Sequence, residues 1–468
     1  MSELTSLGAA AIGAGIQAGE FSPTEVTQAF LDRIARINER LNAFVTLTAD
    51  AALDAAKRRE AELTSGQSRG LLHGVPIGHK DLYYTKGVRT TAGSAVHADF
   101  VPDFDATVVQ RLDEAGTIML GKLNTHEFAY GPTNDASYFG PCRNPWDPDY
   151  FSGGSSGGSG SAVAARLLPA ATGSDTGGSI RMPAACCGVT GLKPTYGRVS
   201  RHGIFPLCWT MDHAGPLARS VEDCALLLES MAGADPADAA CSTRVVEPYH
   251  ANLDRDLAGV RIGIPRRFFF DRAQADVDAA VTNALAELES LGAVLVDVDI
   301  PYIEHAASAA MAIYLAEAVA YHDDQLDDDP SLYTEQVRSF IELGNQVLAK
   351  DYLHAQRYRT LLGQSLSEVM RDIDVLATPG TPITAAPIGV AEVDVRGEAD
   401  GVFGALLRNT EPFDLTGVPA LVMPCGFAAN GMPVSLQLVT RAFDELTALQ
   451  VGHRFQQATD WHLREPGL

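Results

Sequence analysis

The sequence predicts an α/β fold, with a large mixed central sheet that is covered by helices on both faces. Short apolar runs alternate along the chain with segments of helical periodicity, as expected for a layered α/β protein. Several of these runs are apolar at both alternating positions, which is expected of strands buried on both sides. With 468 residues, the chain is long enough to bury a large core.

The N-terminal section, residues 1–65, is predicted to be helical. Ser22 can cap a helix, Pro23 suits its first turn, and Glu25 completes a capping box. Apolar residues follow at helical spacing, so one face of this helix is expected to be buried. A second helix is expected over residues 49–63, which are rich in alanine and in charged residues.

From residue 75 onward, strands and helices are expected to alternate and to build one sheet with its covering helices. The expected strands are residues 75–79, 117–121, 167–173, 260–265, 293–300, 374–379, 420–426 and 434–439. The expected helices are residues 107–115, 221–232, 277–291, 304–321 and 350–371.

A single domain spanning residues 1–468 is predicted, because no linker is evident. The tract GGSSGGSG at residues 153–160 has the composition of a flexible linker. Its flanks argue against that role, because they run on into an alanine-rich helix and then a strand. The helical middle section, about residues 304–371, is expected to form a lid or a subdomain.

Composition and charge argue against several classes of function. The net charge is −24, and a chain this acidic repels phosphate backbones and anionic membranes. There is no apolar run of about 18 residues, the length that a membrane span needs, and the N-terminus lacks the basic segment of a signal peptide. We therefore expect a cytoplasmic protein that contacts neither nucleic acid nor membrane.

The seven cysteines are odd in number and show no CxxC spacing. This pattern argues against a disulfide framework and against a zinc site. The adjacent Cys186 and Cys187 lie in an apolar run and are interpreted as core residues. A reducing compartment fits this pattern, and no metal and no cofactor are expected.

Two tracts rich in glycine and serine are candidates for chemistry. In GSDTGGSIRMPAA, residues 173–185, Gly177 and Gly178 carry no side chain that would keep their N–H groups from converging beside Ser179. Taken alone, such a tract is more often a simple turn. The other tract, GGSSGGSG, does not fit a phosphate-binding loop, because no lysine follows it and the dinucleotide fingerprint fails at its last position.

A serine nucleophile needs a base, and the twelve histidines offer no recognisable Ser-His-Asp context. Lysine is another known partner of a catalytic serine. Lys80 ends the strand-like run GVPIGHKD, which directs it towards a buried sheet end, and burial lowers the pKa of a lysine as a base requires. From spacing alone, a salt bridge to Asp81 is the simpler explanation.

The three segments together resemble the amidase signature family. GVPIGHKDL, GGSSGGS and GSDTGGSIRMPA occur in that order, and 24 residues separate Ser155 from Ser179, as in that family. Flanking runs such as GKLNTHEFAYG, GLKPTYGRVSRHGIFP and MPVSLQLV are also similar, so the resemblance covers nearly the whole chain. It implies an amidohydrolase with the amidase signature fold.

The resemblance implies a relay of three residues. Ser179 attacks the amide carbonyl and becomes acylated. Ser155, which follows a cis peptide bond in this family, bridges Ser179 and Lys80. Lys80 is neutral at rest, takes the proton through Ser155 and returns one to the leaving amine, after which water hydrolyses the acyl-enzyme.

Supporting roles follow from the same resemblance. The oxyanion hole is expected to consist of N–H groups from Thr176, Gly177 and Gly178. Asp175 and Arg181 flank the nucleophile and are expected to hold its loop by charge-assisted hydrogen bonds. Four residues border the family's substrate cleft and are candidates for substrate contacts, although each is individually more often structural: His126, Tyr130, His202 and Trp209.

Three interpretations of the function remain open. The first is a free-standing amidohydrolase for an aryl or aliphatic amide, or for a urea- or carbamate-like compound. Its partner would be that small-molecule amide, and many relatives suggest a homodimer by analogy. The second is the glutaminase A subunit of a tRNA-dependent amidotransferase. The third, a non-catalytic binding protein, has no support, since Lys80, Ser155 and Ser179 are all present.

One segment weighs against the interpretation as an amidotransferase component. Such proteins usually carry basic residues just before the Leu-Gly of a helix near residue 340, where a substrate carboxylate binds. Here the run is SFIELG, so a carboxylate would meet the ring of Phe340 and the negative charge of Glu342. The alanine-rich helix of the middle section suggests an apolar wall, and an apolar acyl or amine group is therefore expected.

Overall fold

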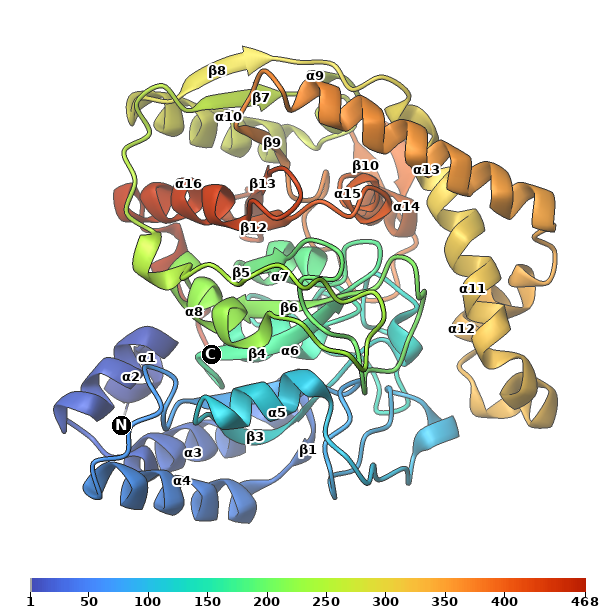
Figure 1. Ribbon diagram of the computed structural model, residues 1–468. Coiled ribbons are helices and arrows are strands. Elements are labelled where there is room, and N and C mark those ends of the chain that lie inside the picture. The colour runs from blue at the N-terminus through green and yellow to red at the C-terminus, as the bar shows by residue number, and fades with distance from the viewer. Residues whose placement is uncertain (1) are drawn as a thin grey trace.

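The computed structural model describes residues 2–468 and contains a mixed sheet of eleven strands (Figure 1). Its strands are β1 (Phe44–Leu47), β2 (Pro76–Lys80), β3 (Ile118–Leu123), β4 (Ala170–Asp175), β5 (Thr190–Lys193), β6 (His213–Ala218), β7 (Arg261–Ile264), β8 (Val294–Asp297), β9 (Val375–Pro379), β12 (Ala420–Phe427) and β13 (Pro433–Val439). They lie side by side in the order β1-β3-β2-β4-β6-β5-β12-β13-β9-β7-β8. A separate hairpin consists of β10 (Glu392–Val395) and β11 (Glu398–Gly401).

Helices precede, connect and follow these strands. They are α1 (Ser2–Ser6), α2 (Ala9–Ala18), α3 (Pro23–Leu41), α4 (Ala49–Thr64), α5 (Thr107–Glu114), α6 (Gly157–Ala164), α7 (Arg181–Cys187), α8 (Val221–Met231), α9 (Arg266–Phe269), α10 (Ala275–Ser290), α11 (Ala306–Asp328), α12 (Glu335–Gly344), α13 (Ala349–Val369), α14 (Val402–Arg408), α15 (Glu411–Leu415) and α16 (Glu445–Ala458). Each expected strand and helix is present with bounds shifted by a few residues, and α11 runs further than expected. Strands β1, β5 and β6, and the β10–β11 hairpin, were not expected.

Parallel and antiparallel pairings both occur in the sheet. Strand β2 pairs in parallel with β3 and β4, whereas β4, β6, β5, β12 and β13 are joined by antiparallel pairings. Because β2 and β4 are parallel neighbours, their carboxyl ends lie at the same edge of the sheet. Lys80 ends β2 and Asp175 ends β4, so this edge brings together two of the motifs singled out in the sequence.

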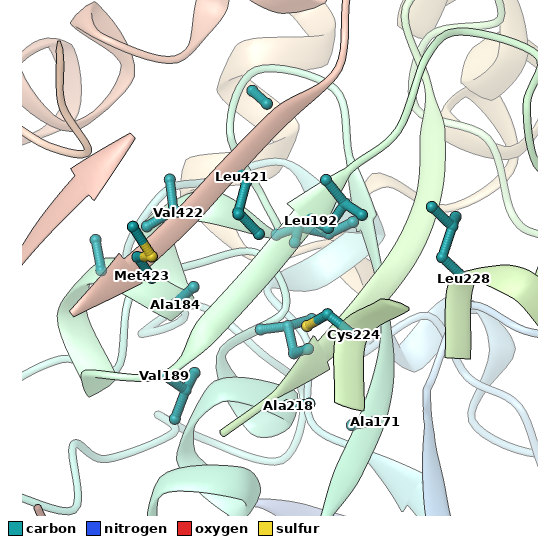
Figure 2. Packing of buried hydrophobic residues seen from close by; sticks show 14 of the residues in the cluster. Ala171, Ala184, Val189, Leu192, Ala218, Cys224, Leu228, Leu421, Val422 and Met423 are labelled. Carbon is teal, nitrogen blue, oxygen red and sulfur yellow. The ribbon is translucent and has the colours of Figure 1, made fainter. Parts of the chain in front are cut away.

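Helices cover both faces of the sheet. Val422 of β12 pairs with Gly191 of β5, and a Cβ on Gly191 would lie 2.8 Å from Ala184 Cβ, so this face packs on α7. The neighbouring Leu421 points to the opposite face, where its Cδ2 would lie 2.6 Å from a Cβ on Gly452 of α16. Side chains from these strands and from α7 and α8 meet in the core (Figure 2). The predicted fold class is confirmed.

The N-terminal and middle sections are helical in the structure. At α3, Ser22 and Glu25 form both hydrogen bonds of the expected capping box. In the middle section, α11 packs against α12 and α13, and the three helices project to one side of the sheet (Figure 1). Glu127 binds the start of α12 by accepting hydrogen bonds from the N–H and the hydroxyl of Thr334 at 2.7 and 2.5 Å. The division into a single domain with a lid stays a prediction.

Within the described residues, none of the helices has both the length and the apolar character needed to cross a bilayer. The seven cysteines are present as free thiols. Cys186 and Cys187 are both buried in the core, as interpreted from their apolar run. Location in the cytoplasm stays a prediction.

Candidate active site

The structure places Lys80 against two serine hydroxyls at the carboxyl edge of the sheet. Its Nζ lies 2.7 Å from Ser155 Oγ and 2.8 Å from Ser174 Oγ, within hydrogen-bond distance of both. Ser155 follows a cis peptide bond from Gly154. Residues 153–160 are all buried and lead into α6, so the glycine-rich tract is a structural segment and not a linker. Lys80 and Ser155 are both fully buried.

Burial lowers the pKa of Lys80 well below its ordinary value of 10.5, although the charges of Asp175 and Asp212 oppose this shift. The neutral amine is therefore favoured at this position. The salt bridge to Asp81 does not form. Asp81 lies 3.6 Å from the ammonium of Lys122 instead and accepts a hydrogen bond from the N–H of Thr91 at 3.0 Å.

Ser179 lies beside this pair and lines a small cavity of about 40 Å³. Its carbonyl accepts a hydrogen bond from the N–H of Ser156 at 3.2 Å, which holds residue 179 next to residue 155. Among the described residues, Ser179 Oγ makes no hydrogen bond, not even with Ser155 Oγ. The structure thus brings Lys80 and Ser155 into direct contact and leaves the Ser179 hydroxyl free.

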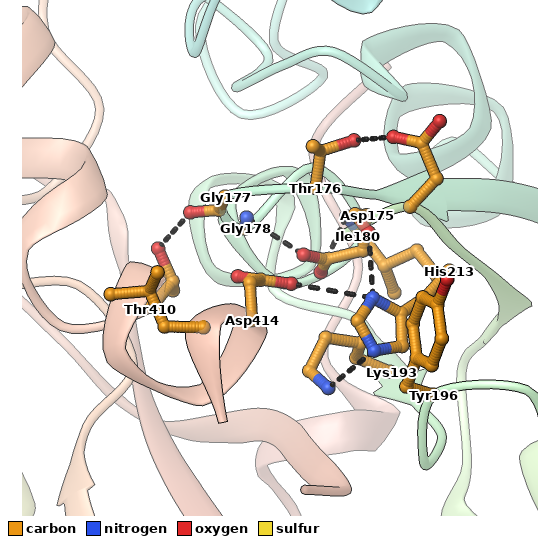
Figure 3. Close-up of polar contacts among 12 residues, drawn as sticks. Asp175, Thr176, Gly177, Gly178, Ile180, Lys193, Tyr196, His213, Thr410 and Asp414 are labelled. Atoms are coloured by element: carbon orange, nitrogen blue, oxygen red, sulfur yellow. Dashed lines mark hydrogen bonds and ion pairs between the residues drawn. The ribbon is translucent and has the colours of Figure 1, made fainter. Parts of the chain in front are cut away.

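The loop that carries Ser179 is held by Asp175 (Figure 3). Its Oδ1 accepts a hydrogen bond from the N–H of Gly178 at 2.7 Å, and its Oδ2 accepts one from the N–H of Ile180 at 3.0 Å. The carbonyl of the same residue lies 3.1 Å from Nδ1 of His213. One carboxylate therefore fixes the backbone on both sides of Ser179.

Arg181 links this loop to the C-terminal part of the chain. Its guanidinium donates to both carboxylate oxygens of Asp175, at 3.0 and 2.9 Å, and makes a short contact with Asp414. It also donates to Gln437 Oε1 at 3.0 Å. Burial alone would raise the pKa of Asp175, but the Arg181 guanidinium holds the pKa of that carboxyl below its usual range. The supporting residues expected from the sequence therefore belong to a larger buried network.

The predicted oxyanion-hole donors differ in availability. The N–H of Gly178 is occupied by Asp175, whereas those of Thr176 and Gly177 have no hydrogen-bond partner in the described part of the chain. Thr410 Oγ1 donates to the carbonyl of Gly177 at 2.5 Å and fixes the orientation of that peptide group (Figure 3). Gly178 has a φ of 133°, and a Cβ there would lie 2.3 Å from Thr410 Oγ1, so only glycine fits.

The four candidate substrate contacts fall in three different places. Tyr130 lines the Ser179 cavity, while His202 and Trp209 line an adjoining cavity of about 300 Å³ that also contains Thr176. His126 has no exposed surface. Its Nδ1 accepts a hydrogen bond from the N–H of Asn134 at 3.2 Å, and burial lowers the pKa of its ring to about 4. The expectation for His126 is therefore corrected, because a fully buried side chain has no surface to offer a substrate.

The wall of the Ser179 cavity is mostly apolar. Phe340 stacks on Phe403 with ring centroids 4.9 Å apart and lies 6.3 Å from the ring of Tyr130. No charged side chain is among the residues that line this cavity: Ala129, Tyr130, Gly131, Pro132, Thr176, Gly177, Ser179, Met182, Leu207, Tyr314, Phe340, Phe403 and Leu407. Phe340 thus lines this cavity, and its contact with a substrate stays a prediction. Glu342 does not line it, since it is exposed and lies 3.7 Å from Arg338.

Several residues at the site were missed in the sequence. Ser174 could have been found, because it lies in the GSDTGGS motif and two residues after Thr172 on the same strand, so both side chains share one face. The hydroxyl of Thr172 accepts a hydrogen bond from the N–H of Lys80 at 3.2 Å. Asp414 and Glu411 lie more than two hundred residues from the nucleophile along the chain and carry no local pattern. Among the described residues, no group of three or more His, Cys, Asp or Glu side chains is placed to hold a metal ion.

Comparison with known proteins identifies similar chains. Residues 25–449 match the family model described as Amidase. A relative from Azotobacter vinelandii (strain DJ / ATCC BAA-1303), named as one of the subunits of glutamyl-tRNA(Gln) amidotransferase, is 44% identical over 98% of this chain and 98% of its own. A structure reported as a vestigial protein complex that reveals the evolutionary origins of an s-triazine catabolic enzyme has a TM-score of 0.93. It is 36% identical and covers 97% of this chain and 98% of its own.

These relatives correct the prediction about partners. The sequence predicted a small-molecule amide as partner, no contact with nucleic acid, and a homodimer by analogy. The Azotobacter relative is named as one component of an enzyme that is itself named for a tRNA, so this prediction is wrong. Its error has a physical cause, because net charge describes the field of one chain and says nothing about the chains that assemble with it.

Proposed function

Because this chain belongs to the amidase family, we propose that it hydrolyses a carboxamide through an acyl-enzyme on Ser179, as the amide-hydrolysing component of an amidotransferase. The contact of 2.7 Å between Lys80 Nζ and Ser155 Oγ, buried beside Ser179, carries the chemical part of the proposal. The Azotobacter relative, which is named as part of an amidotransferase and is 44% identical over nearly the full length of both chains, supports the assembly part.

The first half of the reaction forms the acyl-enzyme. Neutral Lys80 accepts the proton of Ser155 as Ser155 accepts that of Ser179, so that Ser179 Oγ can attack the amide carbonyl. The oxyanion of the tetrahedral intermediate takes hydrogen bonds from the free N–H groups of Thr176 and Gly177. When the C–N bond breaks, the leaving nitrogen receives the proton held by Lys80, returned through Ser155.

The second half releases the acid. Water attacks the ester carbonyl and gives its proton to Lys80 through Ser155. The ester bond to Ser179 Oγ then breaks, and the alkoxide recovers the proton from Lys80. The relay ends in its starting state, so the sum of the reaction is amide plus water to acid plus ammonia or amine.

A second candidate for the substrate is a small neutral amide, and one observation favours it. Glutamine carries a carboxylate and an ammonium on its acyl side, whereas no charged side chain lines the Ser179 cavity. A carboxylate placed against Phe340 and Leu407 would lose its hydration without a compensating partner. The apolar lining therefore favours an acyl group without a carboxylate.

Two measurements test the proposal. Ammonia release from glutamine and from neutral amides is followed with the wild type and Ser179→Ala, and release is expected to vanish in the variant. This chain then replaces its homologous relative within the Azotobacter amidotransferase, and amidation of glutamyl-tRNA(Gln) is measured. Amidation supports the role within an amidotransferase. Hydrolysis of neutral amides without amidation supports the second candidate, and activity retained by Ser179→Ala overturns the mechanism.

A further inference from the structure

Tyr314, which lines the Ser179 cavity, is hydrogen-bonded to a buried glutamate outside the lining, and the catalytic relay uses neither residue. The hydroxyl of Tyr314, from α11, donates a short hydrogen bond to Oε1 of Glu411, from α15. Tyr314 is 7% exposed and Glu411 is 2% exposed. Burial raises the pKa of Glu411 to about 8, and the hydrogen bond that Tyr314 donates opposes this shift.

The pair lies directly beside the oxyanion loop. A Cβ on Gly177 would lie 3.5 Å from Glu411 Cγ and 4.0 Å from Glu411 Oε1. The same Cβ would lie 3.1 Å from Cδ2 of Leu407, and Leu407, Gly177 and Tyr314 all line the cavity. The carboxyl group that Tyr314 binds is therefore next to Gly177, and Tyr314 itself lines the cavity that contains Ser179.

Two other hydroxyl groups of the lining also donate to groups of the protein. Tyr130 donates to the carbonyl of Tyr314 at 2.9 Å, and Thr176 donates to Asp212 at 2.6 Å. Ser179 is the nucleophile. The remaining side chains of the wall are apolar. Each of these hydroxyl oxygens keeps lone pairs that can accept a hydrogen bond, and the Tyr314 hydroxyl is the one bonded to a buried carboxyl group next to Gly177.

The direction of the existing hydrogen bond fixes what Tyr314 can offer. A phenol has one hydrogen to donate and lone pairs to accept. Because that hydrogen points to Glu411, the oxygen is left as an acceptor for an N–H group. A carbonyl or carboxylate oxygen at the same place would face an acceptor and gain nothing.

We propose that the Tyr314–Glu411 pair makes this cavity select amides whose acyl side carries an N–H donor. The proposal rests on the proposed amide hydrolysis at Ser179. Two sources share this chemistry: the neutral N–H of a urea-type compound and the ammonium of an amino-substituted amide. An acyl group of the same size without an N–H leaves the acceptor unpaired, which a site built for hydrogen bonding rejects strongly.

Two isosteric pairs of substrates test the proposal in the full-length chain. Methylurea and propionamide differ by N–H against CH₂ next to the carbonyl. The second pair, 4-aminobutanamide and pentanamide, differs by an ammonium against a methyl at the far end. The ratio of kcat/KM within each pair is measured by ammonia release for the wild type, Tyr314→Phe and Glu411→Gln.

Tyr352→Phe is the matched control. Tyr352, from α13, also donates to a buried glutamate, Glu317 of α11, at 2.9 Å, and this bond joins two helices of the middle section. It does not line the Ser179 cavity. Tyr352→Phe therefore also removes a tyrosine–glutamate hydrogen bond, but it keeps the proposed contact between Tyr314 and the substrate.

The wild type is expected to prefer the N–H member of at least one pair by about tenfold or more. Tyr314→Phe is expected to bring that ratio close to one, and Tyr352→Phe to leave it unchanged. The pair that responds identifies the source, urea-type or ammonium. Wild-type ratios near one overturn the inference, as does an equal loss on both members in Tyr314→Phe. If the wild type hydrolyses no amide at all, the proposed function itself fails.

Discussion

The two sides of the Ser179 cavity are built in different ways. On the nucleophile side, residues 175–181 are fixed by backbone N–H groups that donate to the Asp175 carboxylate and by the Arg181 guanidinium, which donates to the same carboxylate. On the opposite side, ring contacts between Phe340, Phe403 and Tyr130 hold the wall, together with one tyrosine–glutamate bond. The loop that carries the nucleophile is one continuous stretch, whereas the wall is assembled from segments that are far apart in the sequence.

This difference separates reaction from selectivity. Hydrogen bonds to backbone N–H groups need a specific loop geometry, which one short motif encodes. An apolar wall needs only volume and shape, which many combinations of residues supply. Changes on the nucleophile side should therefore abolish turnover, and changes in the wall should alter which amide is used.

The largest effect is expected from Lys80→Met. The variant keeps a buried apolar stem of similar length but removes the base, so kcat/KM should fall by about 10⁴-fold. Lys122→Met serves as the control, since Lys122 is equally buried but binds the carbonyl of Tyr83 and Thr90 instead of the serines. Its folded fraction should keep a kcat near that of the wild type. Equal losses of kcat in the two variants would contradict the role of Lys80.

Arg181→Leu is expected to have the next largest effect, and to act on stability as well as on rate. It leaves Asp175 and Asp414 buried without their cation, which should cost about 3–5 kcal/mol in the free energy of unfolding. Urea unfolding measures this loss. Arg267→Ala, which removes an exposed ion pair with Asp299, should leave the unfolding midpoint unchanged. A similar small shift in both variants would show that the loop does not depend on Arg181.

The pH dependence of stability tests the wall. Because the pKa of Glu411 is raised from 4.5 to about 8 in the folded chain, the folded state holds its proton more tightly than the unfolded state. The raised pKa of Glu411 adds to the free energy of unfolding; this gain is complete below pH 4.5 and is lost as the pH rises through about 8. In Glu411→Gln this loss is absent, so its unfolding temperature should fall less than that of the wild type on the alkaline side. Parallel curves would show that Glu411 is already ionised at neutral pH.

The smallest effect is expected from Phe340→Arg. The guanidinium would supply a cation in a cavity whose lining has no charged side chain, so amides with a carboxylate on the acyl side should gain about tenfold in kcat/KM relative to neutral ones. The control is Phe403→Leu, which changes the stacked ring without adding charge. An equal change of preference in both variants would contradict the claim that the added charge in the wall sets which amide is used.

The nucleophile side could be predicted from the sequence because its parts are local. Lys80 ends a strand, Ser155 and Ser179 lie in two motifs with a fixed spacing, and parallel pairing of β2 with β4 brings their ends together. Asp414 could not be predicted, because it meets Arg181 through tertiary packing across 233 residues. Strands β5 and β6 were missed since they are short and contain glycine or proline.

The wall illustrates what a sequence pattern leaves open. Phe340 was identified because it stands where amidotransferase subunits usually carry a basic residue. Tyr314 lies in an alanine-rich helix and Glu411 lies next to a proline, and neither position signals a role. Their meeting depends on how α11 packs against α15. The prediction about partners failed for a related reason, because an assembly is a property of several chains and not of one net charge.

The central claim is that Ser179 becomes acylated during turnover. Its most direct test is mass spectrometry of the protein quenched in acid during turnover of the 4-nitroanilide of butyric acid, followed by peptide mapping. We expect one butyryl group on the peptide that contains Ser179, and none in Ser179→Ala, which should also be inactive. A butyryl group on another residue, or turnover by Ser179→Ala, would contradict the account.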